Sequence, residues 1–167
     1  MIVIANTAPN HDEAVRGLHR LAFGGTFEAR LVDRLKDDGL VVASLVALDA
    51  GQVVGHILFS TLAMEIDGRP VTSVSLAPMA VAPQRQRQGI GSRLVRTGLA
   101  RLRQGPTEAV IVVGHPAFYP RFGFSAEVVR KLNTPYAGDA FMGLELMPDS
   151  LAGTRGAVRY PPAFDEA

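Results

Sequence analysis

The chain has no cysteine and no tryptophan among its 167 residues, and its formal net charge is only +1. The lack of cysteine excludes disulfides, thiolate metal sites and a cysteine nucleophile. No apolar run approaches the ~20 residues that a membrane-spanning helix needs, and the N-terminus lacks the pattern of a signal peptide. The near balance of 17 basic and 16 acidic side chains argues against broad contact with nucleic acid or membrane. We expect a cytoplasmic protein with neither partner.

Metal binding has equally little support in the sequence. The four histidines show no His-x-x-x-His spacing, by which one helix face presents two imidazoles to a metal ion. We therefore predict no metal site.

The chain does contain enough apolar sequence for one folded domain. Hydrophobic residues make up 47% of it, and a chain of this length buries roughly two thirds of its unfolded surface. No linker, repeat or low-complexity run divides it. We expect a single domain over residues 1–160 and a loose C-terminal tail over residues 161–167.

Hydrophobic periodicity predicts the order of the elements in the first half of the chain. A short strand at residues 1–5 precedes two amphipathic helices, which we expect Asn10 and Thr26 to cap. Three antiparallel strands follow over residues 40–81, and Gly51 supplies the positive φ of the first turn between them.

The second half is predicted to add a crossover helix and further strands. GIGSRLVRTGLARLRQG is amphipathic, with its arginines on the polar face, and TEAVIVVG reads as a buried strand. A strand, a helix and a strand in this order imply a right-handed parallel unit. HPAFYPRFGF suggests a short helix and a turn, and two more strands follow. The fold class is therefore α/β, with a mixed, mostly antiparallel sheet that contains one parallel pair.

A glycine-bearing turn, APQRQRQGIGSRLV over residues 82–95, stands where the long helix begins. A helix N-terminus presents unpaired N–H groups and partial positive charge, and the two glycines leave room for a ligand beside the backbone. No lysine follows them as in a Walker loop, and the third glycine of a dinucleotide fingerprint is missing. On the glycines alone, a phosphate site and a plain helix start chosen for tight packing are equally good interpretations.

The spacing of this turn and two flanking motifs favour the phosphate site. Gln86-x-x-Gly89-x-Gly91 resembles the pyrophosphate-binding signature of the GNAT acetyltransferase superfamily. It follows LAPMAVAP, which is similar to the family's fourth strand with its bulge, and residues 119–124 match the family's Tyr-x-x-x-Gly-Phe. The resemblance covers roughly residues 1–147 and is strongest to the YhbS-like branch.

This resemblance implies acetyl-CoA as the acyl donor, bound where two parallel strands splay apart. The pantetheine arm would pair with the free edge of the fourth strand, at Met79, Ala80 and Val81. Arg85 and Arg87 become candidates for contact with the CoA phosphates. The residues expected to bind the pyrophosphate are Gln86, Arg87, Gln88, Gly89, Ile90, Gly91 and Ser92.

The resemblance also implies how the acetyl group would move. Tyr119 stands where the family places the general acid that protonates the leaving thiolate, although it also belongs to an aromatic cluster that packing alone would explain. A backbone N–H near the bulge at residues 76–79 would stabilise the developing oxyanion. For the base, Glu65, His56 and His115 are all candidates, each with a plain structural alternative.

Two features depart from the family pattern. Val112 stands where many members carry an asparagine, so no asparagine contact to pantetheine is carried over. Pro116 and Pro120 flank the tyrosine, which predicts a helix of one or two turns with Tyr119 at its end.

The acceptor is the least defined part of the prediction. Ser75, Tyr136 and Phe141 are expected to line its groove, and a primary amine of a small molecule or a peptide is the expected acceptor. Three alternatives stay open: another acyl chain or an alcohol acceptor, a non-catalytic acyl-CoA sensor of the same fold, and acetylation of charged tRNA, which would need a broad basic face. A homodimer is also left open.

Overall fold

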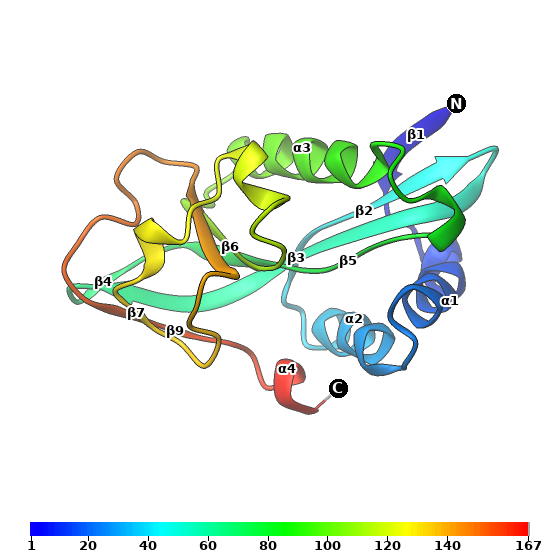
Figure 1. Cartoon of the computed structure of the whole chain (residues 1–167). Helices are drawn as coiled ribbons and strands as arrows, with labels where there is room; N and C mark the ends of the chain where they lie inside the picture. The colour runs from blue at the N-terminus through cyan, green and yellow to red at the C-terminus, as the bar shows by residue number, and fades with distance from the viewer. Residues whose placement is uncertain (167) are drawn as a thin grey trace.

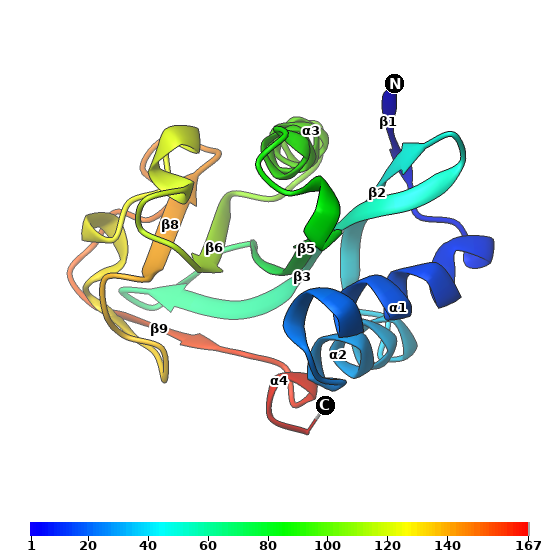
Figure 2. The ribbon, with the colours of Figure 1, turned by 45° about the vertical axis from the view of Figure 1, so that its right-hand side comes forward.

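The computed structural model describes residues 1–166 and consists of one twisted mixed sheet with helices on both faces (Figures 1 and 2). Its main path runs β1-β2-β3-β5-β6-β8. β5 and β6 are parallel, and the other neighbours on this path are antiparallel. The strands of the path are β1 (Ile2–Asn6), β2 (Val41–Asp49), β3 (Gln52–Ile66), β5 (Ser73–Val81), β6 (Ala109–Val113) and β8 (Phe141–Glu145).

β3 is much longer than its neighbours and carries a second, smaller group of strands at its far end. Over Ala63 to Ile66 it pairs with β9, and its last two residues also pair with β4. These short strands are β4 (Arg69–Pro70), β7 (Leu132–Asn133) and β9 (Gly156–Arg159). The predicted mixed sheet with a parallel strand pair is confirmed in β5 and β6, and β7 and β9 form a further parallel pair in the smaller group.

The helices lie on opposite faces of the sheet. Figure 2 shows α3 above it and α1, α2 and α4 below it. The α-helices are α1 (Asp12–Phe23), α2 (Phe27–Asp37), α3 (Ile90–Arg103) and α4 (Ala163–Glu166). Short 3-10 turns occur at Pro9–His11, Pro83–Arg85, Tyr119–Phe122 and Glu127–Val129.

α3 packs closely on the sheet through its apolar stripe and through two glycines at the contact, Gly98 in α3 and Gly55 in β3. Its expected apolar residues are all buried, while its arginines are exposed. A Cβ at Gly98 would overlap the ring of Phe59, and one at Gly55 would come within 3.0 Å of Leu94. These glycines bring helix and sheet close together, which holds the N-terminus of α3 beside β5.

Two local predictions about the ends of elements are wrong. α1 starts at Asp12 after a 3-10 turn, so Asn10 is not its cap. Thr26 is the N-cap residue of α2 as predicted, although its side chain makes no capping hydrogen bond. The segment after Pro161 is not loose: α4 forms there, and Ala163 is fully buried in a cluster with α2. The C-terminal segment therefore packs against the first helices and helps to shape the site described next.

Candidate active site

The two parallel strands part in the middle of the sheet. β5 and β6 pair from Ser73 to Leu76, after which β6 ends while β5 continues to Val81. At this point β5 also bulges, because Met79 lies opposite Ile57 whereas Leu76 lies opposite Phe59. The predicted parallel pair and the predicted bulge therefore coincide, and one edge of β5 beyond Leu76 has no strand beside it.

The free edge of β5 offers backbone hydrogen-bonding groups. The N–H of Ala82 donates to the carbonyl of Val54 in β3 at 2.9 Å. Since successive residues of a strand direct these groups to opposite sides, Ala80 also faces β3, whereas Met79 and Val81 face the free edge. The Gln86 side chain already donates to the Val81 carbonyl at 3.2 Å. Met79 is thus the residue with both backbone groups available.

The turn that follows β5 presents a row of unpaired backbone donors. From Gln86 to Ser92, no backbone N–H has an acceptor in the part of the chain that the structure describes. Arg87 and Gly89 adopt the left-handed conformation, with φ of 63° and 84°, which curls the chain so that successive N–H groups form an anion-binding nest. The row ends at the N-terminus of α3, whose dipole adds partial positive charge.

The glycines of this turn are not explained by packing. A Cβ at Gly89 would meet nothing within 4 Å, and one at Gly91 would meet nothing closer than 3.7 Å. Ile90, between them, is buried in the core and leaves only its backbone to the turn. The turn is therefore open on the side where a ligand would approach, which favours the anion-site interpretation over a plain helix start.

The arginines around the turn have different roles. Arg85 is bound to Asp49 at 2.7 Å, and this hydrogen bond lowers the pKa of the Asp49 carboxyl. Arg93 donates to the Ile2 carbonyl, and Arg96 lies over the ring of Phe122. Arg87 is exposed and makes no hydrogen bond or ion pair with the described residues. Of the two arginines expected at the phosphates, the structure leaves Arg87 available, while Arg85 anchors the turn to the β2–β3 hairpin.

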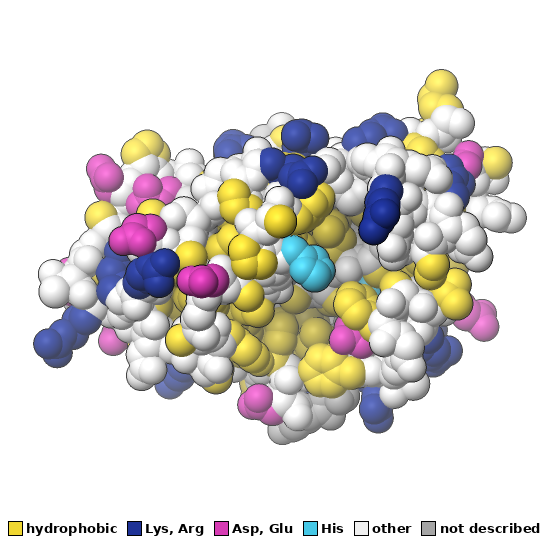
Figure 3. Space-filling view, in the orientation of Figure 1, with side chains coloured by type: hydrophobic (Ala, Val, Ile, Leu, Met, Phe, Trp, Pro, Cys, Tyr) yellow, Lys and Arg dark blue, Asp and Glu magenta, His cyan; other side chains and the backbone are white. Residues whose placement is uncertain are grey.

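A cavity of about 500 Å³ opens beyond the bulge, on the α2 side of the sheet. Residues 76–79 and Tyr119 line it together, and the exposed His115 lies in its wall. Figure 3 shows hydrophobic side chains gathered in a hollow in the middle of this face, below α3. The cavity brings the bulge and the tyrosine of the sequence motif to one place.

Tyr119 is held in this wall by close packing. It is 7% exposed, and its ring lies 5.0 Å from that of Phe118 and 5.7 Å from that of Phe124. A Cβ at Gly114 would overlap the Tyr119 ring, so the ring sits directly over the backbone there. Burial raises the pKa of Tyr119 to about 12, and its hydroxyl has no hydrogen-bond partner in the described chain. The side chain is thus a fixed phenol that stays protonated at neutral pH.

The local structure around Tyr119 differs from the sequence prediction. Tyr119 begins the 3-10 turn Tyr119–Phe122 and does not end a helix. The reason is that residues 116–118 form only a turn, and Pro120 lies in the first turn of the 3-10 segment that Tyr119 begins. Val112, which stands at the position of the asparagine in the family pattern, is buried in the core.

Of the three candidate bases, only His115 lines the cavity. Glu65 lies in a separate polar pocket with Asp67 and Lys131. It is six residues beyond Phe59 along β3, which places it about 20 Å from the bulge at ~3.3 Å per residue. The structure therefore does not bring Glu65 to Tyr119, because β3 runs far past the point where β5 and β6 separate.

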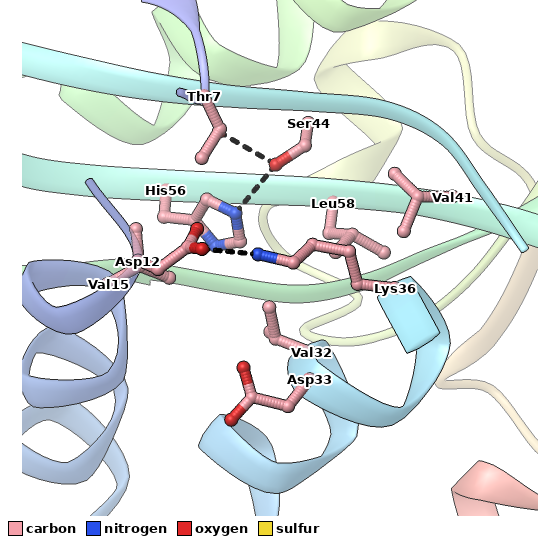
Figure 4. A pocket seen from close by; sticks show the side chains of 10 residues that line it. All are labelled: Thr7, Asp12, Val15, Val32, Asp33, Lys36, Val41, Ser44, His56 and Leu58. Carbon is pink, nitrogen blue, oxygen red and sulfur yellow. Dashed lines mark hydrogen bonds and ion pairs between the residues drawn. The ribbon is translucent and has the colours of Figure 1, made fainter. Parts of the chain in front are cut away.

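The third candidate, His56, is enclosed in a chain of buried polar groups. Its Nδ1 lies 2.8 Å from His19 Nε2, and its Nε2 lies 3.0 Å from Ser44 Oγ, which donates to Thr7. Figure 4 shows His56, Ser44 and Thr7 in a small pocket of about 30 Å³, beside the ion pair of Lys36 with Asp12. His56 does not line the larger cavity, so it is placed to connect β2 and β3 with α1 and not to meet an amine there.

This histidine pair predicts a loss of stability in acid. Burial lowers the pKa of His19 to about 4 and that of His56 to about 3, below the ~6.5 of an unfolded histidine. The unfolded chain then binds more protons, so stability is complete above about pH 6.5 and falls as the pH drops, by on the order of 2 kcal/mol per histidine at pH 5. Urea unfolding at pH 7 and pH 5 measures this, and His56→Gln should reduce the pH dependence. The exposed His115→Gln is the control, and equal pH dependence in His56→Gln and wild type would contradict the assignment.

The predicted acceptor residues divide in a similar way. Ser75 and Tyr136 line the cavity with Tyr119. Phe141 does not, because at the start of β8 its side chain is buried in a hydrophobic core cluster with Ile111 and Val129. Nothing in the structure connects Phe141 to the acceptor position.

The sequence analysis missed most of the cavity wall. Glu28, in the first turn of α2, is the carboxylate of the lining. The remaining aromatic residues come from the α1–α2 junction, the loop after β6 and the C-terminus; they are Phe23, Phe27, Phe118, Tyr160 and Phe164. In the sequence, only Phe23 and Phe27, which flank the glycine pair between the two early helices, indicated this cavity wall.

Comparison with known proteins assigns the family. Residues 5–126 match the model of the acetyltransferase (GNAT) domain. The chain belongs to the GNAT acetyltransferase family. It is 36% identical, over 90% of its length and 91% of the relative's, to the uncharacterized N-acetyltransferase YhbS of Escherichia coli K12. The resemblance to the YhbS-like branch is confirmed.

Solved structures of GNAT proteins agree with this assignment over the whole fold. E. coli YhbS in complex with CoA superposes with a TM-score of 0.89 at 34% identity, covering 98% of this chain and 92% of that one. A GNAT acetyltransferase of Brucella melitensis in complex with acetyl-CoA gives 0.82 at 33% identity, covering 99% of each chain.

Residues 1–166 contain neither a metal-binding cluster nor a membrane-spanning helix. No group of three or more histidine, aspartate or glutamate side chains is placed to hold a metal ion there. No helix in that range has the length and hydropathy to cross a bilayer.

Proposed function

We propose that the protein transfers an acetyl group from acetyl-CoA to a primary amine by direct attack of the amine. The observation that carries this proposal is the cavity in which Tyr119 and residues 76–79 meet, at the end of the free edge of β5. The pyrophosphate turn begins at the other end of that edge. Donor and scissile bond would then lie one after the other along the free edge of β5, with the general acid Tyr119 across the cavity at its end.

The donor would be bound mainly by backbone groups. The unpaired N–H groups from Gln86 to Ser92 suit the pyrophosphate, and Arg87 adds a free cation beside them. Met79, with Val81, would pair with the pantetheine amides as an added strand. The YhbS and Brucella proteins, solved with CoA and acetyl-CoA, support the same class of donor for this chain.

The chemistry requires charge stabilisation and one proton donor. As the amine attacks the thioester carbonyl, negative charge develops on its oxygen, and a backbone N–H of the bulge at residues 76–79 would stabilise it. The C–S bond then breaks, and Tyr119, which is protonated at neutral pH, gives its proton to the thiolate. The wall contains no cysteine, so transfer through an acetyl-cysteine is excluded.

A non-catalytic acyl-CoA sensor is the second candidate, since the same turn would bind the donor without turnover. The two functions differ in one measurement: CoA release from acetyl-CoA, followed with a thiol reagent, in the presence and absence of a panel of amines. We expect release that depends on an amine. Tight acetyl-CoA binding without release by any amine would favour the sensor.

A further inference from the structure

The charge distribution in the cavity wall restricts the acceptor. Seven of the seventeen lining residues are aromatic, and none is lysine or arginine. Glu28 is the one carboxylate among them, and His115 the one imidazole. An acceptor with a phosphate or carboxylate would face Glu28 with no cation to bind it, and a polyamine or aminoglycoside would leave most of its charges against aromatic rings.

Glu28 is available for a ligand. It lies half-buried in the first turn of α2, and it makes no hydrogen bond or ion pair within residues 1–166. In contrast, Asp12 and Asp33 in the two early helices are paired, with Lys36 and with Arg16 respectively. A carboxylate without a partner at the wall of an aromatic cavity is suited to an ammonium group.

The aromatic side chains provide the rest of the site. Phe23 and Phe27, on either side of the α1–α2 junction, are 48% and 37% exposed although they are large and apolar. On the other side, the rings of Tyr136 and Tyr160 lie 4.8 Å apart and that of Phe164 lies 5.0 Å from Tyr160. Such faces bind apolar or aromatic groups and add cation–π attraction for an ammonium nearby.

We propose that the acceptor is a primary monoamine with an apolar, preferably aromatic, body, and that Glu28 binds its ammonium group and takes the proton that must leave before attack. This rests on the proposed function for the identity of the reaction. The volume of about 500 Å³ lies within the range of small-molecule sites, which agrees with a small amine better than with a folded protein substrate.

The amine nitrogen loses two protons in the reaction. The ammonium gives one proton to Glu28, and the neutral amine forms the C–N bond to the acetyl carbon. The C–S bond breaks, the sulfur takes the Tyr119 proton, and the second proton lost by nitrogen restores the tyrosine hydroxyl. Glu28 passes its proton to solvent, so the products are the N-acetyl amine, CoA thiol and one proton.

The experiment separates binding from turnover. 2-Phenylethylamine is titrated calorimetrically into the protein saturated with CoA, and its kcat/KM as acceptor is compared with those of spermidine, glycine and an aminoglycoside. Glu28→Gln should weaken 2-phenylethylamine binding at least about tenfold, as expected for loss of a charged hydrogen bond, without changing acetyl-CoA affinity. Glu13→Gln is the matched control, since Glu13 is an exposed acidic residue in the first turn of α1. The neutral analogue 2-phenylethanol should bind the wild type and Glu28→Gln with equal affinity.

The outcomes distinguish this proposal from the proposed function. Binding of 2-phenylethylamine that depends on Glu28, without CoA release from acetyl-CoA with any of the amines, would support the amine site and overturn the enzyme. Turnover of spermidine or glycine above that of 2-phenylethylamine, or equal amine binding by Glu28→Gln and wild type, would overturn the acceptor proposal and leave the enzyme in place. No amine binding to the CoA complex would likewise overturn it.

Discussion

A chain carrying Arg87→Glu and Gly89→Glu is expected to bind acetyl-CoA at least about 100-fold more weakly than the wild type. The first change removes the free cation beside the turn, and both place carboxylates next to the unpaired N–H groups where the pyrophosphate would lie. Gly89 is also left-handed at φ 84°, a conformation that costs a residue with a side chain about 1–2 kcal/mol. Calorimetry at fixed ionic strength measures the dissociation constant.

The control reproduces the same changes away from the turn. Arg103→Glu with Gly39→Glu alters the charge equally and also places glutamate at a left-handed glycine, with φ 71° and nothing within 4 Å of its Cβ. Arg103 is exposed at the end of α3. We expect acetyl-CoA affinity within about twofold of wild type. If both double variants bind alike, the pyrophosphate is not held at residues 86–92.

Tyr119→Phe is expected to lower kcat about 100-fold or more, which is the usual effect of losing a general acid. The change removes one oxygen from a ring that is otherwise held by Gly114 and the neighbouring aromatic side chains. The hydroxyl has no partner in residues 1–166, so neither the melting temperature nor the acetyl-CoA dissociation constant should change. Stopped-flow measurement of CoA release at saturating substrates gives kcat.

The same variant also tests the alternative that Tyr119 only packs. A packing role predicts unchanged kcat, because phenylalanine keeps the ring and its contacts. An equal loss of acetyl-CoA affinity and of kcat would indicate a binding role for the hydroxyl. Only a loss confined to kcat agrees with proton transfer to the thiolate.

The parts of the site that follow local rules could be predicted from the sequence. The turn is local, since Gly89 and Gly91 mark a helix start with free N–H groups. The parallel pair follows from the order of strand, helix and strand. Tyr119 was located by motif spacing alone.

The acceptor cavity could not be predicted in the same way, because segments far apart in sequence assemble it. Glu28 and Tyr160 line one cavity because the C-terminal segment folds back and α4 packs against α2, and helical periodicity carries no information on that packing. Glu65 lies far from the bulge because its position depends on how β3 is aligned with β5: the sequence predicts the strand as far as Glu65 but not its register against β5. Phe141 lies outside the cavity because both faces of β8 are buried: Phe141 packs in the cluster with Ile111 and Val129, and Met142 and Leu144 pack on the opposite face.

Transfer by direct attack of the amine is tested by incubating the protein with acetyl-CoA, with and without 2-phenylethylamine. CoA release and the intact mass of the protein are then measured in both samples. We predict that CoA is released only with the amine, in amounts equal to the N-acetyl product, while the mass of the protein stays unchanged. A protein that gains an acetyl group without amine, or releases CoA equally in both samples, would contradict attack by an amine bound beside Tyr119.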